Sequence, residues 1–328
     1  MQKLDIALDL VGGIIYALLN AAWVNSAGVE SDMSVCSSQE AVMTASKRAG
    51  FWICVLSIFV CAAWSVSAGQ DGGPPHDDIV QAQIVLTVSE SKRLIARSVA
   101  RMPIVKKALK EGMVIIAKGT TNTYVAEEIL GEKIAHGPYI LGKTFPAKGG
   151  KPFKPAEGLS EVIIVKGEHK KRLTVEEAVK RLQPGDIVIK GANALNYENK
   201  TAGVIIGSSS CGTTGKIMPY VVARKAHLVI PVGLEKQVSG SVVDIANKMR
   251  QPVESLNDIP SMFLLTGHII TEIEALQSFA DVSVFQAAAG GIGGAEGAVR
   301  IICRGSRSQV DKILRLAEEI QGEPPFVE

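Results

Sequence analysis

The sequence predicts an α/β fold built on a parallel sheet. Short runs rich in Val and Ile, such as MVIIA at 113–117, EVIIV at 161–165 and DIVIK at 186–190, alternate with stretches of helical character. Continuous β-branched runs are typical of strands buried on both faces, and the intervening helices cover such a sheet. We therefore predict a Rossmann-like parallel sheet with helices on both faces over residues 85–260.

Composition limits the class of protein and the kind of ligand. At 328 residues, with 47% hydrophobic and 21% charged residues, the chain is too apolar to be disordered. Its five cysteines include no CxxC pair, so we expect no disulfide scaffold, no metal site and no cofactor. Residues 81–328 hold 32 basic and 25 acidic side chains, a surplus of seven. These are scattered without interleaved aromatics, which favours a small anionic ligand over nucleic acid.

The first eighty residues have a different character. Lys47 and Arg48 precede an uncharged run with the apolar centre FWICVLSIFVCAAW, and the run ends in Val66-Ser67-Ala68, small at its last position. A basic start, an apolar core and a small-residue end are typical of a secretory signal peptide, and about 20 apolar residues also suffice to span a bilayer. Residues 43–68 are therefore predicted to be a cleaved signal peptide or a membrane anchor through residues 49–68.

The assignment of residues 43–68 also sets what we expect of the stretches before and after them. Met43 lies just before the basic pair, so residues 1–42 are expected to be an N-terminal extension or a misplaced translation start. Residues 69–84 are expected to form a linker, because Gly-Gly-Pro-Pro cannot continue a helix. The protein is expected to be exported or membrane-anchored, or cytoplasmic if its true start lies near residue 81.

Caps, breakers and apolar runs give the order of elements in the α/β part. Ser89 and Ser91 can cap a helix that continues to Lys110, and Gly112 ends it. Thr174 followed by Val-Glu-Glu is a capping box that opens another helix. The expected strands are 113–117, 161–165, 186–190, 203–207 and HLVIPVG from His227, with helices over 124–130 and up to Arg224 and a long loop at 143–160.

The tail from Ser261 has the pattern of a smaller unit. We expect a strand near 263–265, a helix over 271–279, strands over 282–288 and 298–303, and a helix over 308–320. This order is typical of a split βαβ arrangement. We therefore predict a small C-terminal α+β subdomain of ferredoxin-like type over residues 261–328.

Three loops rich in Gly, Thr and Ser follow strand-like runs and predict an anion site. They are Gly119-Thr-Thr-Asn, Gly207-Ser-Ser-Ser-Cys-Gly-Thr-Thr-Gly-Lys and Gly290-Gly-Ile-Gly-Gly-Ala-Glu-Gly. Glycine lets the backbone approach a ligand, and N–H groups at a helix start bind phosphate or carboxylate. Strand-to-helix loops of a parallel sheet emerge at one edge. The loops at 119–122, 190–193, 207–216 and 290–297 are therefore expected to form one cleft.

Parts of the chain resemble a known superfamily. LKEGMVIIAKGTTNTYVAEEIL at 109–130 resembles the opening of the ribose-5-phosphate isomerase, glucosamine-6-phosphate deaminase and CoA-transferase superfamily, which sugar-sensing repressor effector domains share. The stretches 185–196 and 203–236 resemble later parts of that fold. The resemblance implies that Gly119, Thr120 and Thr121 form its phosphate loop. The acidic turn of the isomerases falls on residues 190–194, which hold no carboxylate, and this argues against ordinary isomerase activity.

The candidate residues lie mainly in these loops. Glu296, set among glycines, and Lys216, beside a glycine loop, are the catalytic candidates; the resemblance to CoA-transferases adds Glu235 by residue type. Glu272 and Glu274 are expected to face solvent. The residues expected to bind the ligand are Gly119, Thr120, Thr121, Asn122, Lys190, Gly191, Asn193, Gly212, Thr213 and Thr214.

Three functions are compatible with these features. The first is binding of a small phosphorylated, carboxylate or acyl ligand in the glycine-rich cleft, which the missing acidic turn favours. The second is an enzyme of the isomerase or CoA-transferase type acting on such a ligand. The third is a structural membrane-attached domain. Expected partners are the small anion and, if residues 49–68 stay uncleaved, a membrane; no nucleic acid is expected, and a homo-oligomer is left open.

Overall fold

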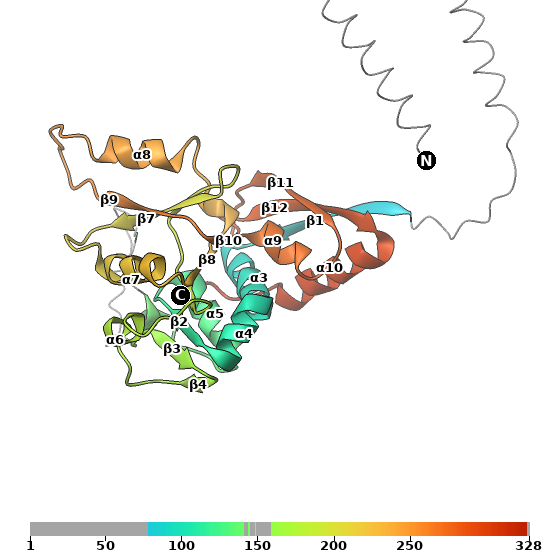
Figure 1. The fold of residues 1–328 in the computed structure, drawn as a ribbon. Coiled ribbons are helices and arrows are strands. Elements are labelled where there is room, and N and C mark those ends of the chain that lie inside the picture. The colour runs from blue at the N-terminus through green and yellow to red at the C-terminus, as the bar shows by residue number, and fades with distance from the viewer. Residues whose placement is uncertain (1–77, 141–143, 145–147, 149–158, 327–328) are drawn as a thin grey trace, which may run out of the picture. The chain divides into compact units, whose positions relative to one another are not determined.

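The computed structural model describes residues 78–140, 144, 148 and 159–326 (Figure 1). Residues His76–Glu328 form one compact unit. The expected N-terminal extension, the signal peptide or anchor at 43–68, and most of the expected loop at 143–160 lie outside the described residues. In the part that is described, no helix is long and apolar enough to cross a bilayer.

A six-stranded mixed sheet forms the centre of this unit. Across the sheet its strands are β10 (His268–Ile270), β8 (His227–Pro231), β5 (Ile187–Ile189), β2 (Met113–Ile116), β3 (Val162–Val165) and β4 (Glu168–His169). The first four run parallel, and each of the last two is antiparallel to the strand before it. Every residue of β2 and β5 is buried, as the Val and Ile runs predict. The α/β class is confirmed.

Helices pack beside this sheet in two groups. α3 (Val88–Arg101) packs against α5 (Thr120–Leu130) and α9 (Glu272–Gln277), and it also contacts β8 and β10. α4 (Pro103–Glu111) contacts β2, β3 and β5, while α6 (Val175–Val179) packs against α7 (Gly212–Ala223). α3 also touches α10 (Arg307–Ile320), so it connects the central sheet to the C-terminal helix (Figure 1).

α3 begins at Thr87 rather than at Ser89 or Ser91. Thr87 Oγ1 accepts a hydrogen bond from the Glu90 N–H at 3.3 Å, and the Glu90 carboxylate accepts one from the Thr87 N–H at 2.8 Å. This capping box places both serines inside the first turns, where they are buried. The helix expected to reach Lys110 is broken at Met102, because a residue before proline avoids the helical conformation and Pro103 starts α4.

The sequence predicts that the run at 203–207 joins the parallel sheet, and this prediction is wrong. It belongs to β7 (Thr201–Ile206), which pairs antiparallel with β6 (Ala194–Asn196) and β9 (Ser261–Leu265), and α8 (Val242–Met249) packs on β9. Only residues 197–200 connect β6 to β7. A connection that short can only return the chain antiparallel, because a parallel pair needs a long crossover.

A third sheet joins the two ends of the described chain. β1 (Ile79–Leu86) pairs along its whole length with β12 (Val299–Ser306), which also pairs with β11 (Ser283–Ala289). Residues 79–84, expected to be linker, are therefore strand. Residues 261–328 contribute to all three sheets, since β9 pairs with β7 and β10 with β8. Two short 3-10 helices, η1 (Gly137–Tyr139) and η2 (Leu234–Lys236), complete the elements.

Candidate functional site

Polar residues follow each of the four parallel strands at the carboxyl edge of the central sheet. The loop after β2 leads into α5, and Lys190 directly follows β5. Glu235 and Lys236 lie in η2 just after β8, and Glu272 comes two residues after β10. Because the carboxyl ends of parallel strands meet at one edge, ligands in such sheets usually bind there.

Asn122, in the first turn of α5, holds the ends of β2 and β5 together. Its Nδ2 donates to the carbonyl of Ala117 at 2.7 Å and to that of Ile189 at 3.2 Å. Its Oδ1 faces Gly191, because a Cβ added there would lie 3.7 Å from this oxygen. Asn122 Oδ1 and the hydroxyl of the neighbouring Thr121 are buried without a hydrogen-bond partner among the described residues. The 119–122 loop and the 190–191 turn therefore meet. Two polar atoms at this contact, Asn122 Oδ1 and the Thr121 hydroxyl, are available to hydrogen-bond a ligand.

Two carboxylates meet at Gly233. Glu272 has no exposed surface, and its Oε2 accepts a hydrogen bond from the Leu234 N–H at 2.9 Å. A Cβ added at Gly233 would collide with Glu235 Oε2 and lie 3.0 Å from Glu272 Oε1. Within the part of the chain that the structure describes, both of these oxygens are buried without a hydrogen-bond partner. Burial and the charge of Glu235 raise the pKa of Glu272 to about 7.

Three lysines lie at the same edge of the sheet, linked through Lys236. Lys92, on α3, is only 9% exposed, and burial together with the charge of Lys236 lowers its pKa to about 8. Burial and the charge of Lys236 also lower the pKa of Lys190 to about 8, and its Nζ donates to the Gly191 carbonyl at 3.1 Å. Lys236 Nζ lies 3.8 Å from Glu235 Oε1. Lys236 therefore acts on both other ammonium groups.

These six residues are named here the carboxyl-edge cluster: Lys92, Asn122, Lys190, Glu235, Lys236 and Glu272. Exposure falls with depth, from a Lys236 side chain that is 22% exposed, through Glu235 at 14%, to Glu272 at zero. The outer side chains of the cluster therefore contact solvent, whereas Glu272 does not. Ammonium groups beside a carboxyl that titrates near neutrality can bind an anion and exchange a proton with it.

The loop at 207–216 does not share the contacts that join the 119–122 loop to the 190–191 turn. Lys216 Nζ makes an ion pair at 2.5 Å with Glu176 of α6, and this carboxylate raises the pKa of Lys216. Cys211 and Gly212 have left-handed backbone conformations where α7 begins, and Thr213 and Thr214 lie in its first turn. Among the described residues, no hydrogen bond or ion pair joins this loop to the cluster.

Glu296 lies in the hairpin loop between β11 and β12 and is exposed. Its carboxylate accepts hydrogen bonds from the N–H groups of Gly293 at 3.1 Å and Gly294 at 2.9 Å, and backbone N–H groups lower its pKa. It thus supports its own loop. The loop packs on the start of α3, because a Cβ added at Gly297 would lie 2.9 Å from Val88 Cγ2.

Asn193 belongs to the β6–β7 hairpin. Its N–H donates to the Gly203 carbonyl at 2.7 Å, and its Oδ1 accepts from the Ile205 N–H at 3.0 Å. Of the other expected ligand-binding residues, Asn122 and Lys190 belong to the cluster, and Gly119, Thr120, Thr121 and Gly191 are their neighbours in the chain. The side chain of Asn193 is occupied by the hairpin that it holds.

Two residues of the cluster differ from the sequence-based expectations. The prediction for Glu272 is wrong, and Lys92 is not among the predicted site residues. Glu272, expected to face solvent, is fully buried, because it starts α9 directly beneath the loop that follows β8. Glu274 is partly exposed and accepts hydrogen bonds from Tyr197 and Lys200. Lys92 was not singled out, although it lies three residues before Ile95 and so on the apolar face of α3. A lysine at an apolar-face position is the signal that could have found it.

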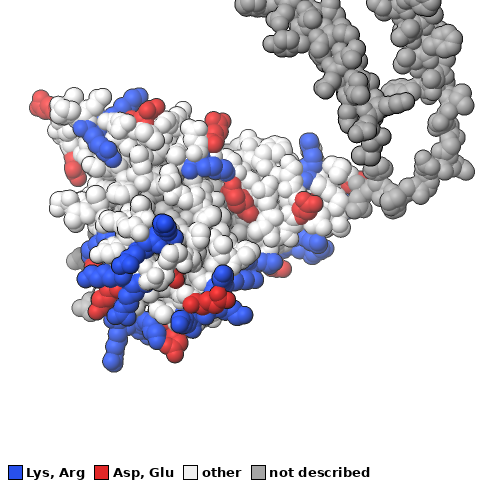
Figure 2. Space-filling model, viewed as in Figure 1, with Lys and Arg blue, Asp and Glu red and all other residues white. Residues whose placement is uncertain are grey.

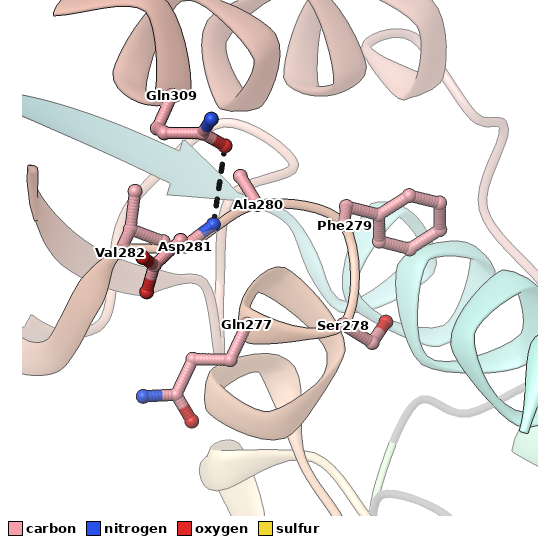
Figure 3. A pocket seen from close by; sticks show the side chains of 7 residues that line it. All are labelled: Gln277, Ser278, Phe279, Ala280, Asp281, Val282 and Gln309. Atoms are coloured by element: carbon pink, nitrogen blue, oxygen red, sulfur yellow. Dashed lines mark hydrogen bonds between the residues drawn. The ribbon is translucent and has the colours of Figure 1, made fainter. Parts of the chain in front are cut away.

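Other features of the surface do not coincide with the cluster. The pocket in Figure 3 is lined by Gln277, Ser278, Phe279, Ala280, Asp281, Val282 and Gln309, and Gln309 accepts a hydrogen bond from the Asp281 N–H. Exposed basic side chains gather over the end of the molecule that holds β4 and α6 (Figure 2). Within the described ranges, no group of three or more His, Cys, Asp and Glu residues is arranged to hold a metal ion.

Comparison with protein-family models, curated proteins and solved structures finds no match for this chain.

Proposed function

We propose that this protein binds a small anionic ligand at the carboxyl-edge cluster. The observation that carries the proposal is the convergence of Lys92, Lys190 and Lys236 from three separate elements at the edge where four parallel strands end. Neither Lys92 nor Lys190 has a carboxylate within ion-pair distance among the described residues. Buried ammonium groups that lack a direct ion pair are costly, and a bound anion would neutralise them.

The atoms without partners narrow the class of ligand. Asn122 Oδ1, Glu235 Oε2 and Glu272 Oε1 are buried acceptor oxygens to which no group of the described residues donates a hydrogen bond. A ligand with hydroxyl groups beside its anionic group would supply donors to these oxygens and an acceptor to the lysines. Sugar phosphates and hydroxy acids combine both features. We therefore favour a polyhydroxylated phosphate or carboxylate.

The Rossmann-like arrangement and the superfamily resemblance remain part of this proposal. They are supported by four parallel strands and by a glycine-threonine loop between β2 and α5. The carboxylates of the cluster come from Glu235 and Glu272, after β8 and β10, rather than from the turn at 190–194. If the chain belongs to that superfamily, its acidic groups occupy different strand ends. The ferredoxin-like subdomain has weaker support, because β1 supplies one of the strands beside β12.

A second candidate function is proton transfer on the bound anion. A general acid or base works best when its pKa lies near the operating pH. Glu272, with a pKa of about 7, meets this condition, and Glu235 beside it can stabilise the protonated state. Glu272→Gln separates the two functions: a binding protein would keep its affinity with nothing else lost, whereas an enzyme would bind its substrate without turnover.

The binding proposal is tested by the thermal stability of the full chain with ribose 5-phosphate, citrate and acetyl-CoA, and with uncharged ribose as the control ligand. A ligand at 100 times its dissociation constant adds about 2.7 kcal/mol of stability. Lys190→Met and Lys236→Met should each weaken binding by roughly 10- to 150-fold, the value of a charged hydrogen bond. Lys107→Met, on the exposed side of α4, is the matched control. Equal affinity in all three variants would refute the proposal.

A further inference from the structure

A second concave site lies between α3 and α10. It has a volume of about 560 Å³ and is lined by Arg97 and Arg101 of α3, by Lys312 and Arg315 of α10, and by Phe279. Pockets for small ligands commonly have volumes of about 300–1,000 Å³. We call this the α3–α10 groove.

The cations of this groove face one another across two helices. Arg97 and Arg101 are four residues apart on α3, and Lys312 and Arg315 are three apart on α10, so each pair lies on one helix face. Arg97 is paired with Glu319 at 2.9 Å, but the Glu319 side chain is 65% exposed. Within the described ranges, the other three cations have no carboxylate at ion-pair distance.

The one further carboxylate that lines the groove is already engaged. Glu128 makes an ion pair at 2.9 Å with Arg93, whose side chain is 6% exposed. Four cations therefore share the groove with two carboxylates, Glu319 and Glu128, so its side chains carry a surplus of positive charge. Like charges that line one groove repel one another, and an anion bound between the helices would offset the repulsion.

Phe279 gives the groove an aromatic wall. The Arg101 guanidinium carbon lies 4.4 Å from the centre of its ring. Figure 3 shows this ring turned away from Gln309, on the side of the neighbouring pocket where α3 lies. Stacking of this kind orients the planar guanidinium and leaves its N–H groups free to form paired hydrogen bonds with phosphate oxygens.

We propose that the α3–α10 groove binds a small molecule bearing two or more phosphate groups. Four cations spread over two helices match a chain of phosphates better than a single one. The site is distinct from the carboxyl-edge cluster: Arg97 and Arg101 lie five and nine residues beyond Lys92 on the same helix, which is about 7.5 Å and 13.5 Å at 1.5 Å per residue. The groove and the cluster share no residue.

The test is a calorimetric titration of the full chain with inorganic tripolyphosphate at 150 mM salt (about physiological ionic strength). We expect saturable binding that the double variant Arg101→Gln/Arg315→Gln weakens at least tenfold (~1.4 kcal/mol). The control Lys106→Gln/Lys107→Gln removes the same charge from the exposed side of α4 and should leave affinity within twofold. Lys190→Met, in the carboxyl-edge cluster, should also leave it unchanged.

Several outcomes would overturn the inference. Absence of saturable binding would do so, and so would equal weakening by the control variant, which would show only a general charge effect. Loss of binding in Lys190→Met alone would place tripolyphosphate in the carboxyl-edge cluster. A single-stranded oligonucleotide that binds the same arginines more tightly than tripolyphosphate would show that the groove takes a nucleic-acid backbone instead of a small molecule.

Discussion

Replacing Glu272 by glutamine should change how the stability of the protein depends on pH. Burial and the charge of Glu235 raise the pKa of Glu272 from the ordinary 4.5 to about 7. In the unfolded chain the carboxyl group is solvated and ionises near its ordinary value. Between these two pH values the folded protein keeps a proton that the unfolded chain has lost, so rising pH favours unfolding.

The size of the effect follows from the two pKa values. Their difference, 7 minus 4.5, is 2.5 units, and one unit corresponds to about 1.4 kcal/mol, so the free energy of unfolding should fall by about 3 kcal/mol. This contribution is complete below pH 4.5 and is lost by pH 7. Glutamine has nearly the same shape and cannot ionise. The variant should therefore lack this part of the decline.

Urea unfolding between pH 4.5 and pH 8 measures the difference. It is best followed by far-ultraviolet circular dichroism, because Trp23, Trp52 and Trp64 all lie before the first described residue. Relative to the unchanged protein, Glu272→Gln should gain about 3 kcal/mol across this range. Glu318→Gln, exposed on α10, should gain nothing. Parallel curves for Glu272→Gln and the unchanged protein would refute the buried, proton-holding state of Glu272.

Three further outcomes are expected. Gly233→Ala should displace the Glu235 carboxylate and so weaken the pH dependence of the free energy of unfolding. Gly191→Ala, whose Cβ would lie no nearer than 3.6 Å to any atom beyond its neighbours in the chain, should leave this dependence unchanged. Urea unfolding over the same pH range distinguishes the two variants. Asp186→Ala should destabilise the protein, because the N–H groups of Met113 and Gln183 lose their acceptor, at about 1–3 kcal/mol for each group. Asp186→Asn should destabilise it by less. Equal melting temperatures for Asp186→Ala and the unchanged protein would contradict the structure. A reporter fused to residues 43–80 should become membrane-associated or exported, and a soluble cytosolic reporter would remove that prediction.

The strands could be located from the sequence because their signal is local. Val and Ile runs mark Met113–Ile116, Val162–Val165 and Ile187–Ile189 to within one or two residues, since burial on both faces leaves no polar alternation. Which strands pair is not local information. β7 pairs with β9, more than fifty residues later, and β1 pairs with β12 at the other end of the described chain. These partners are chosen by packing, which the runs do not encode.

The candidate site could be predicted only in part, for the same reason. Glycine and polar residues next to strand ends pointed to Asn122 and Lys190. The burial of Glu272 could not be predicted, because it depends on the loop around Gly233, 39 residues earlier in the chain, and on the N–H of Leu234. The capping box that Thr271 and Glu274 form at the start of α9 is typical of an exposed helix end, yet here that end lies under another loop.

The pKa shifts within the cluster also determine when it attracts an anion. As pH rises through about 7, Glu272 loses its proton and adds a negative charge to the cluster. As pH rises through about 8, Lys92 and Lys190 lose their protons and remove positive charge from it. Both changes make the cluster less attractive to an anion. An anion favours the protonated state, so it takes up protons as it binds, and its affinity should fall as pH rises through this interval.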